Sequence, residues 1–125
     1  MDWTPHQPAP VLVVDDHAGY RAVMREVVQA TPGLSVAGEA SSGEAAIEVL
    51  ERLAVRLVIM DKRMPGMGGL AACQIITERY RNTVVIVCSV EDSSFDRVSP
   101  YGATAVIRKQ DLSPAKLQDI LASLA

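Results

Sequence analysis

The sequence predicts a doubly wound α/β fold, in which a five-stranded parallel sheet lies between two layers of helices. Short apolar runs recur five times, and a helical pattern or a turn follows each of them. Such uninterrupted runs are typical of strands that are buried on both faces. Regular alternation of strands and helices favours a parallel sheet with right-handed crossovers. The length of 125 residues suits one domain.

Composition excludes several classes of protein. The chain is 49% hydrophobic and 22% charged, and its net charge is −3, so no broad basic field predicts direct binding of nucleic acid. No apolar run approaches the roughly 20 residues that span a bilayer, and no signal peptide is visible. We therefore expect a cytoplasmic protein without membrane contact. Cys73 and Cys88 are isolated and are expected to be reduced, partly buried thiols.

The first predicted elements are a leader, a strand and a helix. Residues 1–10 contain three prolines and no periodicity, so we expect a flexible leader and a domain that spans residues 11–125. Residues 11–14 form a buried strand that ends at Asp15 and Asp16. The segment 31–33 ends the helix that follows. The buried stripe of this helix is predicted to be Tyr20, Val23, Met24, Val27 and Val28.

A weaker strand, a second helix and the central strand come next. Residues 34–38 are predicted to lie at a sheet edge, and Ser41 with Glu44 resembles a capping box. Residues 57–60 form the third strand, which ends at Asp61. A turn with one proline and three glycines leads into a helix over about residues 69–79. The stripe of the second helix is predicted to be Ala46, Val49, Leu50 and Leu53.

The last third of the chain is less regular. Residues 84–88 form a fourth buried strand, but the next helix has only Phe95 and Val98 as apolar anchors, and Pro100 cuts it short. Residues 105–107 form the fifth strand. Ser113 and Pro114 predict the cap and first turn of the final helix. The stripe of that helix is Leu117, Ile120, Leu121 and Leu124.

Five polar residues are predicted to meet at one edge of the sheet, because the carboxyl ends of parallel strands lie together and bind ligands there. Three carboxylates so close would raise one another's pKa unless a cation neutralised them, and hard oxygen ligands suit Mg²⁺. A nucleophilic carboxylate with a metal, an ammonium and a hydroxyl can accept a phosphoryl group. The five residues are Asp15, Asp16, Asp61, Ser89 and Lys109.

Four of these five residues also have a structural explanation. Asp15 and Asp16 could cap the first helix, Lys109 could be a solvated lysine, and Ser89 could belong to a turn. His17 is interpreted as a first-turn helix residue rather than a ligand. The combination at one edge favours the phosphoryl-transfer interpretation.

Four spaced motifs carry a family resemblance. They are residues 13–16, Asp61 with residues 64–69, Ser89, and residues 102–103 ahead of Lys109. With them the chain resembles the receiver domain of bacterial two-component response regulators. Asp15-Asp16-His17, and a Lys109 that no proline follows, are most similar to the NarL/LuxR-type branch. The resemblance implies a flavodoxin-like (βα)5 three-layer sandwich with strand order 2-1-3-4-5.

The resemblance also implies roles and partners. Asp61 would accept a phosphoryl group from a sensor histidine kinase, while Ser89 and Lys109 bind the phosphate. Asp16, Asp61 and the backbone carbonyl of Arg63 would ligate Mg²⁺, which Mn²⁺ can replace, with Asp15 acting mostly through water. The chain would catalyse only its own phosphorylation and slow autodephosphorylation. A DNA-binding effector domain outside this chain, attached or separate, would regulate transcription, and homodimers could form.

The chain departs from the family pattern at the output face and the site mouth. Val106 replaces the usual aromatic relay residue, for which nearby Tyr101 could substitute. Val90 replaces a smaller residue and is expected to narrow access to Asp61. Arg63 and Glu91 carry opposite charges and are expected to pair over the acyl phosphate.

Three other functions are weighed against the switch. Val106 and the short fourth helix would suit a degenerate receiver that acts as a phosphorylation-independent interaction module. An aspartyl phosphatase would need a second carboxyl group where Arg63 stands. A flavin phosphate would be repelled by Asp15 and Asp16. The intact set of five polar residues favours the phosphorylation switch.

Overall fold

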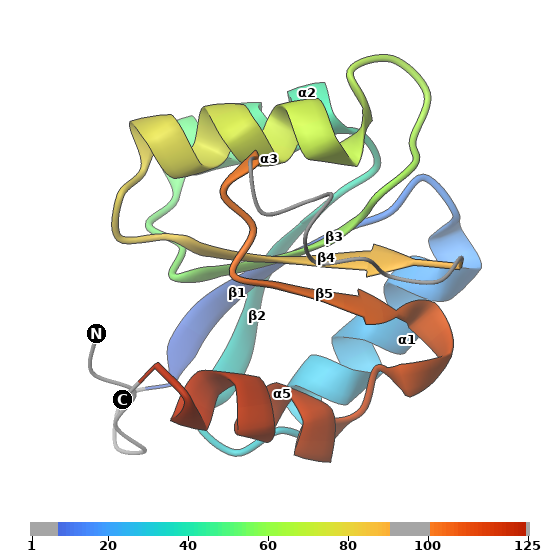
Figure 1. Ribbon diagram of the computed structural model, residues 1–125, viewed down its shortest axis with the longest axis vertical. Coiled ribbons are helices and arrows are strands. Elements are labelled where there is room, and N and C mark those ends of the chain that lie inside the picture. The colour runs from blue at the N-terminus through green and yellow to red at the C-terminus, as the bar shows by residue number, and fades with distance from the viewer. Residues whose placement is uncertain (1–7, 91–100, 125) are drawn as a thin grey trace.

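Five apolar segments pair into one parallel sheet. The computed structural model describes residues 8–90 and 101–124, and its strands follow the order β2-β1-β3-β4-β5 (Figure 1). The strands are β1 (Ala9–Val14), β2 (Leu34–Ala40), β3 (Leu57–Asp61), β4 (Val84–Ser89) and β5 (Ala105–Arg108). All residues of β3 and β4 are buried, whereas only the first and last residues of β2 are buried, in agreement with its location at the sheet edge. The predicted fold class and strand order are confirmed.

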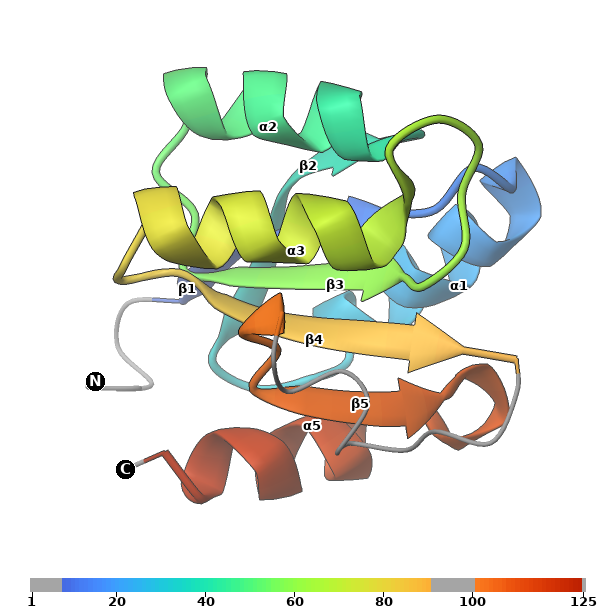
Figure 2. The ribbon, with the colours of Figure 1, turned by 45° about the horizontal axis from the view of Figure 1, so that its top comes forward.

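Helices cover both faces of the sheet. Figures 1 and 2 show α2 and α3 on one face and α1 and α5 on the other. The helix predicted around Phe95 and Val98 lies outside the described residues. No helix of the described part of the chain is long and apolar enough to cross a membrane. The helices are α1 (Ala18–Gln29), α2 (Gly43–Arg52), α3 (Gly68–Arg79) and α5 (Pro114–Ala122), and a 3₁₀ turn, η2 (Lys109–Asp111), precedes α5.

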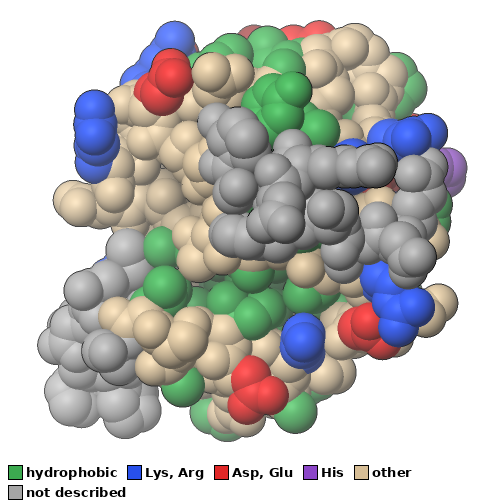
Figure 3. All heavy atoms as spheres, in the orientation of Figure 1, with side chains coloured by type: hydrophobic (Ala, Val, Ile, Leu, Met, Phe, Trp, Pro, Cys, Tyr) green, Lys and Arg blue, Asp and Glu red, His purple; other side chains and the backbone are tan. Residues whose placement is uncertain are grey.

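The core has two parts because successive strand residues face opposite sides of the sheet. Leu12, Val58 and Met60 pack towards α2 and α3, and Val11 and Ile59 pack towards α1 and α5. In the view of Figure 3, hydrophobic side chains also gather beside β5 and along α3, while most of the Lys and Arg side chains in view lie towards the margin. The two core clusters cover both faces of the sheet, and parallel pairing sets the register of its strand ends.

Two predicted boundaries are wrong. The leader was predicted to extend to residue 10, but Ala9 and Pro10 belong to β1, where the Ala9 N–H donates to Gly33 O (2.8 Å). Residues 1–7 lie outside the described residues. The cap of α2 is Ser42 rather than Ser41, because Ser42 is extended and its Oγ accepts from the Ala45 N–H (3.0 Å). The cap of α5 at Ser113 is confirmed.

Some side chains are buried differently from the prediction. Val23 and Leu53 were predicted to lie in buried stripes, but they are 43% and 44% exposed. Val23 lies at the margin of the apolar face of α1, and Leu53 is the extended residue that follows α2. Cys73 and Cys88 are free and buried, and burial raises the pKa of both thiols to about 12. Both are therefore neutral, unreactive parts of the core.

A close approach positions the end of β3. The Gly69 N–H donates to the Lys62 carbonyl (3.0 Å), and a Cβ atom at Gly69 would collide with the carbonyl oxygen of Asp61. Only glycine allows α3 to begin so close to the strand end. This contact and the bond from the Lys62 N–H to the Cys88 carbonyl (2.7 Å) hold the backbone around Asp61 between α3 and β4.

Candidate functional site

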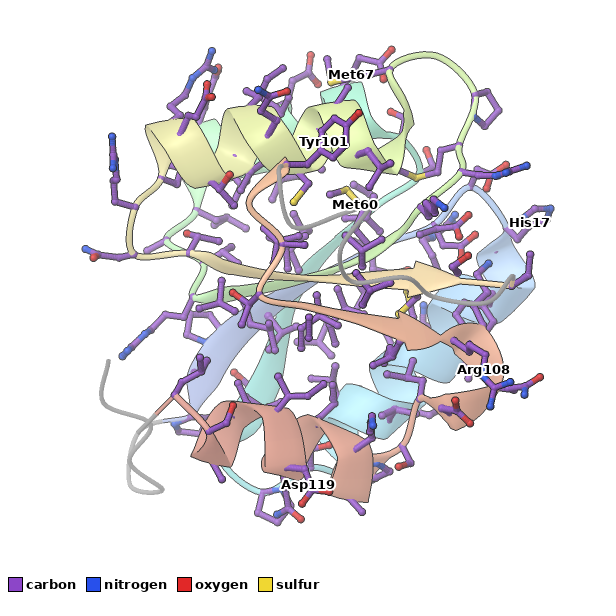
Figure 4. The ribbon with its side chains drawn as sticks, viewed as in Figure 1. His17, Met60, Met67, Tyr101, Arg108 and Asp119 are labelled. Atoms are coloured by element: carbon purple, nitrogen blue, oxygen red, sulfur yellow. The ribbon has the colours of Figure 1, made fainter. Side chains whose placement is uncertain are left out.

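The carboxyl edge of the sheet brings the predicted polar residues together. Asp15 follows β1, Asp61 ends β3, Ser89 ends β4 and Lys109 follows β5. Asp15, Asp61 and Ser89 are 0%, 5% and 3% exposed, which is unusual for polar side chains in a small domain. This edge is where the arrowheads of β4 and β5 point in Figure 1, and His17 lies beside it in Figure 4.

Lys109 joins two of the carboxylates. Its Nζ lies 2.7 Å from Oδ2 of Asp15 and 3.4 Å from Oδ1 of Asp61. The carboxylates come from neighbouring strands, and one ammonium therefore reduces the repulsion between them. The shorter distance identifies Asp15 as the stronger partner of Lys109.

The site changes the proton affinities of its own groups. Burial, and then the charge of Asp15, raises the pKa of Asp61, although Lys109 and a hydrogen bond from the Arg63 backbone act in the opposite direction. Burial alone would lower the pKa of Lys109. The hydrogen bond to Asp15 and the charges of Asp61 and Asp15 outweigh that effect, so the pKa of Lys109 is raised. The ammonium is thus charged across the physiological range, and the Asp61 carboxylate is destabilised.

Backbone contacts hold Asp15 in place. Its Oδ1 accepts from the His17 N–H (2.8 Å), and its carbonyl oxygen accepts from Nη1 of Arg21 (2.8 Å). The residue that caps α1 is His17, which makes no side-chain cap bond. The alternative in which Asp15 and Asp16 cap this helix is therefore wrong.

Asp16 offers an unsatisfied oxygen. Its buried Oδ1 accepts no hydrogen bond from the described residues, although Nδ1 of His17 lies 3.2 Å away without hydrogen-bond geometry. Ligand atoms of Asp15, Asp16 and His17 lie within 4.8 Å of one another. A buried carboxylate oxygen without a partner next to a second carboxylate is a donor set that fits a hard divalent cation. The side chain of His17 is 73% exposed, and Figure 4 shows it pointing away from the sheet.

Tyr20 is a contact residue that the sequence interpretation took only as core. Its hydroxyl donates to the Lys109 carbonyl (2.9 Å), and Nζ of Lys109 lies 4.3 Å from its ring centroid. Burial is the main cause that raises the pKa of Tyr20, and the charges of Asp15 and Asp61 act in the same direction, so the hydroxyl stays protonated. The available signal was an aromatic residue one helical turn after Asp16, on the face that meets the sheet.

The surroundings of the predicted modulators of the site are described only in part. Val90 is 74% exposed just beyond β4, and Glu91 lies outside the described residues. Val106 pairs with Val87 and is half-buried against the cluster under α2 and α3. The Tyr101 carbonyl accepts from Oγ1 of Thr77 (3.3 Å), which places Tyr101 beside α3 (Figure 4). The roles of Arg63, Val90, Glu91 and Val106 stay predictions.

Known proteins share this fold and sequence pattern. The family model for response regulator receiver domains matches residues 11–122. The nitrate/nitrite response regulator protein NarL of Escherichia coli K12 is 34% identical over 120 residues, which are 94% of this chain and 54% of that protein. A protein-glutamate methylesterase/protein-glutamine glutaminase of Pyrococcus horikoshii is 36% identical over 106 residues, 82% of this chain and 29% of that protein.

A solved structure agrees with these relatives. The signal receiver domain of a NarL response regulator from Mycobacterium tuberculosis superimposes with a TM-score of 0.81 at 26% identity, and 94% of each chain is covered. The present chain spans about half the length of E. coli NarL and less than a third of the methylesterase. The similarity thus covers nearly the whole of this chain but only part of the curated relatives.

Proposed function

Because the chain belongs to the family of response regulator receiver domains, we propose that it is a phosphoacceptor switch of a two-component phosphorelay. The NarL relatives confirm the predicted similarity to the NarL/LuxR-type branch. The observation that carries the proposal is the buried Asp61 carboxylate at the end of a central strand, 3.4 Å from the Lys109 ammonium.

In the proposed reaction, a carboxylate oxygen of Asp61 attacks the phosphorus of a phosphohistidine on a sensor histidine kinase. A P–O bond forms while the P–N bond breaks, and the imidazole nitrogen leaves with the electron pair and takes up a proton. The product is an acyl phosphate on Asp61. Burial supports this role, because a poorly hydrated carboxylate has little water to displace before the attack.

The neighbouring residues can stabilise the charge that develops on the phosphoryl oxygens. Lys109 carries a charged ammonium close to Asp61, and the Ser89 hydroxyl lies on the adjacent strand. The Arg63 backbone N–H donates to the Asp61 carboxylate and holds it in place. We therefore assign phosphate binding to Lys109 and Ser89.

The acidic residues fit a divalent cation. The orphan Oδ1 of Asp16 beside the buried Asp15 supports a Mg²⁺ site, which Mn²⁺ can also fill. We assign Asp16, Asp61 and the backbone carbonyl of Arg63 as ligands, with Asp15 acting mostly through water. Bound there, the ion would neutralise charge on the transferred phosphoryl group.

Phosphorylation is proposed to change a partner-binding face. E. coli NarL is a response regulator about twice as long as this chain, so we infer that an effector domain, attached or separate, regulates transcription. Net charge −3 argues against nucleic-acid binding by the receiver itself. A cytoplasmic location and homodimer formation belong to the same proposal.

The site is proposed to serve only its own phosphorylation and slow autodephosphorylation. The Pyrococcus relative is named for methylesterase and glutaminase activities, but the present chain covers 29% of that protein. The carboxyl edge offers a phosphoacceptor and a charge clamp, and these suit a stoichiometric switch rather than a turnover enzyme.

The test is intact mass after incubation with Mg²⁺ and phosphoramidate. The parent should gain one phosphoryl group, Asp61→Asn should gain none, and a chelator should prevent the gain. Asp119→Asn, an exposed carboxylate on α5 (Figure 4), is the matched control and should behave like the parent. Mg²⁺ binding without any gain would point to access narrowed at Val90 and would call for a kinase donor. Neither a gain nor Mg²⁺ binding would overturn the switch in favour of a phosphorylation-independent interaction module.

A further inference from the structure

Tyr20 contacts both the backbone and the side chain of Lys109. The Tyr20 hydroxyl donates to the lysine's own backbone carbonyl (2.9 Å). The lysine Nζ lies 4.3 Å from the centroid of the ring, within the range of a cation–π contact. The first contact fixes the backbone of Lys109, and the second restricts the rotamers of its side chain.

The Lys109 ammonium has three electrostatic partners of different kinds. Asp15 is nearest (2.7 Å), Asp61 is further away (3.4 Å), and the Tyr20 ring is uncharged. A divalent cation at Asp15 and Asp16 would compete with Lys109 for the charge of Asp15. The ring does not bind that hard cation, so it remains a partner for the ammonium when Asp15 is engaged.

We propose that Tyr20 is a positioning residue for phosphoryl transfer, which holds the Lys109 ammonium beside Asp61 through its ring and fixes the Lys109 backbone through its hydroxyl. The inference rests on the proposed function, because it gives a further residue to the same site. It also links α1 mechanically to the junction of β5 and η2, since Lys109 is the first residue of η2.

A space-filling role is the alternative to positioning. Tyr20 is half-buried against the core cluster on the α1 and α5 side of the sheet, and a leucine would also fill that space. The two roles differ in their dependence on Lys109. A filler acts through stability alone, whereas a positioning residue acts only while Lys109 is present.

The kinetic test is a double-mutant cycle on the phosphorylation rate with phosphoramidate and saturating Mg²⁺. We expect Tyr20→Leu to slow the reaction about tenfold, because it removes both the cation–π contact and the hydrogen bond. Tyr20→Phe keeps the ring and removes only the hydrogen bond, so it should slow the reaction about threefold. In a Lys109→Ala background, Tyr20→Leu should have no further effect. Tyr80→Leu, at the C-terminal end of α3 on the opposite edge of the sheet, is the control and should match the parent.

Two kinetic outcomes would overturn the proposal: an unchanged rate in Tyr20→Leu, or an equal slowing with and without Lys109. If Tyr20→Leu does not fold, Tyr20→Phe replaces it in the test, because this variant retains the ring and removes only the hydroxyl. Its rate and its cycle with Lys109→Ala are then decisive.

A second measurement separates this inference from the proposed function. The chain has three lysines, Lys62, Lys109 and Lys116, so lysine-labelled protein gives a simple NMR spectrum. The ε-methylene signal of Lys109 should show an upfield ring-current shift that Tyr20→Leu removes and Tyr20→Phe keeps. A parent that gains no phosphoryl group would count against the switch, whereas an unshifted Lys109 signal would count against positioning by Tyr20.

Discussion

The two ends of the sheet treat buried polar groups in opposite ways. At the amino edge, the buried Thr31 and Thr83 each donate a hydroxyl to a backbone carbonyl at 2.7 Å, so both are neutral and satisfied. At the carboxyl edge, Asp15 and Asp61 lie buried next to each other and share one ammonium. The polar groups at the amino edge therefore stabilise the fold. Those at the carboxyl edge carry unbalanced negative charge, which suits the binding of a cation and a phosphoryl group.

Removing the shared ammonium should have the largest effect on the difference between the two edges. Lys109→Ala leaves Asp15 and Asp61 facing each other without a cation, and we expect the free energy of unfolding to fall by about 3 kcal/mol at neutral pH. Added Mg²⁺ should restore part of the loss by neutralising the same carboxylates. Urea unfolding with and without Mg²⁺ measures both effects.

Lys116→Ala is the matched control, because this lysine is exposed on α5 and makes none of these contacts. Its unfolding free energy should equal that of the parent. A Lys109→Ala protein as stable as the parent would show that the carboxylates do not repel each other in the folded state.

The amino edge predicts a smaller loss from a neutral change. Thr83→Val is nearly isosteric but removes the hydroxyl that donates to the Val55 carbonyl. We expect a loss of about 1.5 kcal/mol, because a buried carbonyl is left without its donor. Phosphorylation with phosphoramidate should not change, and urea unfolding alongside the mass assay checks both statements. A Thr83→Val protein that keeps full stability would remove the contrast between the edges.

Sequence patterns predict the site's location better than its internal contacts. Apolar runs and the polar residues after them place Asp15, Asp61, Ser89 and Lys109 at one edge, because parallel pairing leaves no other arrangement of strand ends. They do not rank Asp15 above Asp61 as the partner of Lys109. That preference depends on side-chain reach across the strands, which periodicity does not contain.

Local sequence patterns do not predict contacts that depend on residues distant in sequence. Ser41 and Ser42 are equally good caps in sequence, and the extended backbone at Ser42 selects it, while Glu44 accepts from the Met67 N–H (3.3 Å) instead of closing a capping box. Tyr20 was correctly placed on the inner face of α1. Its contact with Lys109, 89 residues away, could not be predicted because it depends on how α1 packs under the sheet.

The predicted cation gives the next test of the carboxyl edge. Mg²⁺ that binds only the folded state should raise the free energy of unfolding by about 1.4 kcal/mol at ten times its dissociation constant. Asp16→Asn should weaken this effect, because it replaces the orphan Oδ1 carboxylate oxygen by part of an amide. Thermal unfolding against Mg²⁺ concentration measures the effect. The same shift in Asp16→Asn and in the parent would place the ion elsewhere.

The smallest expected effect comes from replacing a charged group at the carboxyl edge with a neutral group of the same shape. The pKa of Asp61 is raised in the folded state by burial and by Asp15, so folding favours the protonated acid. Stability therefore decreases as the pH rises from the ordinary aspartate pKa through the raised one, and stays reduced above it. Asp61→Asn removes the carboxylate, and we expect a gain on the order of 1 kcal/mol at pH 7.

The sign of this change and its pH dependence separate the two edges. The gain in Asp61→Asn should vanish in acid, below the ordinary aspartate pKa, where the parent is protonated in both folded and unfolded states. Asp119→Asn on α5 should give no gain at any pH. Urea unfolding at several pH values measures the difference. If Thr83→Val lowers the free energy of unfolding and Asp61→Asn raises it, the buried polar group stabilises the fold at the amino edge and destabilises it at the carboxyl edge, where the carboxylate must react. A lower free energy of unfolding in both variants would contradict this difference between the edges.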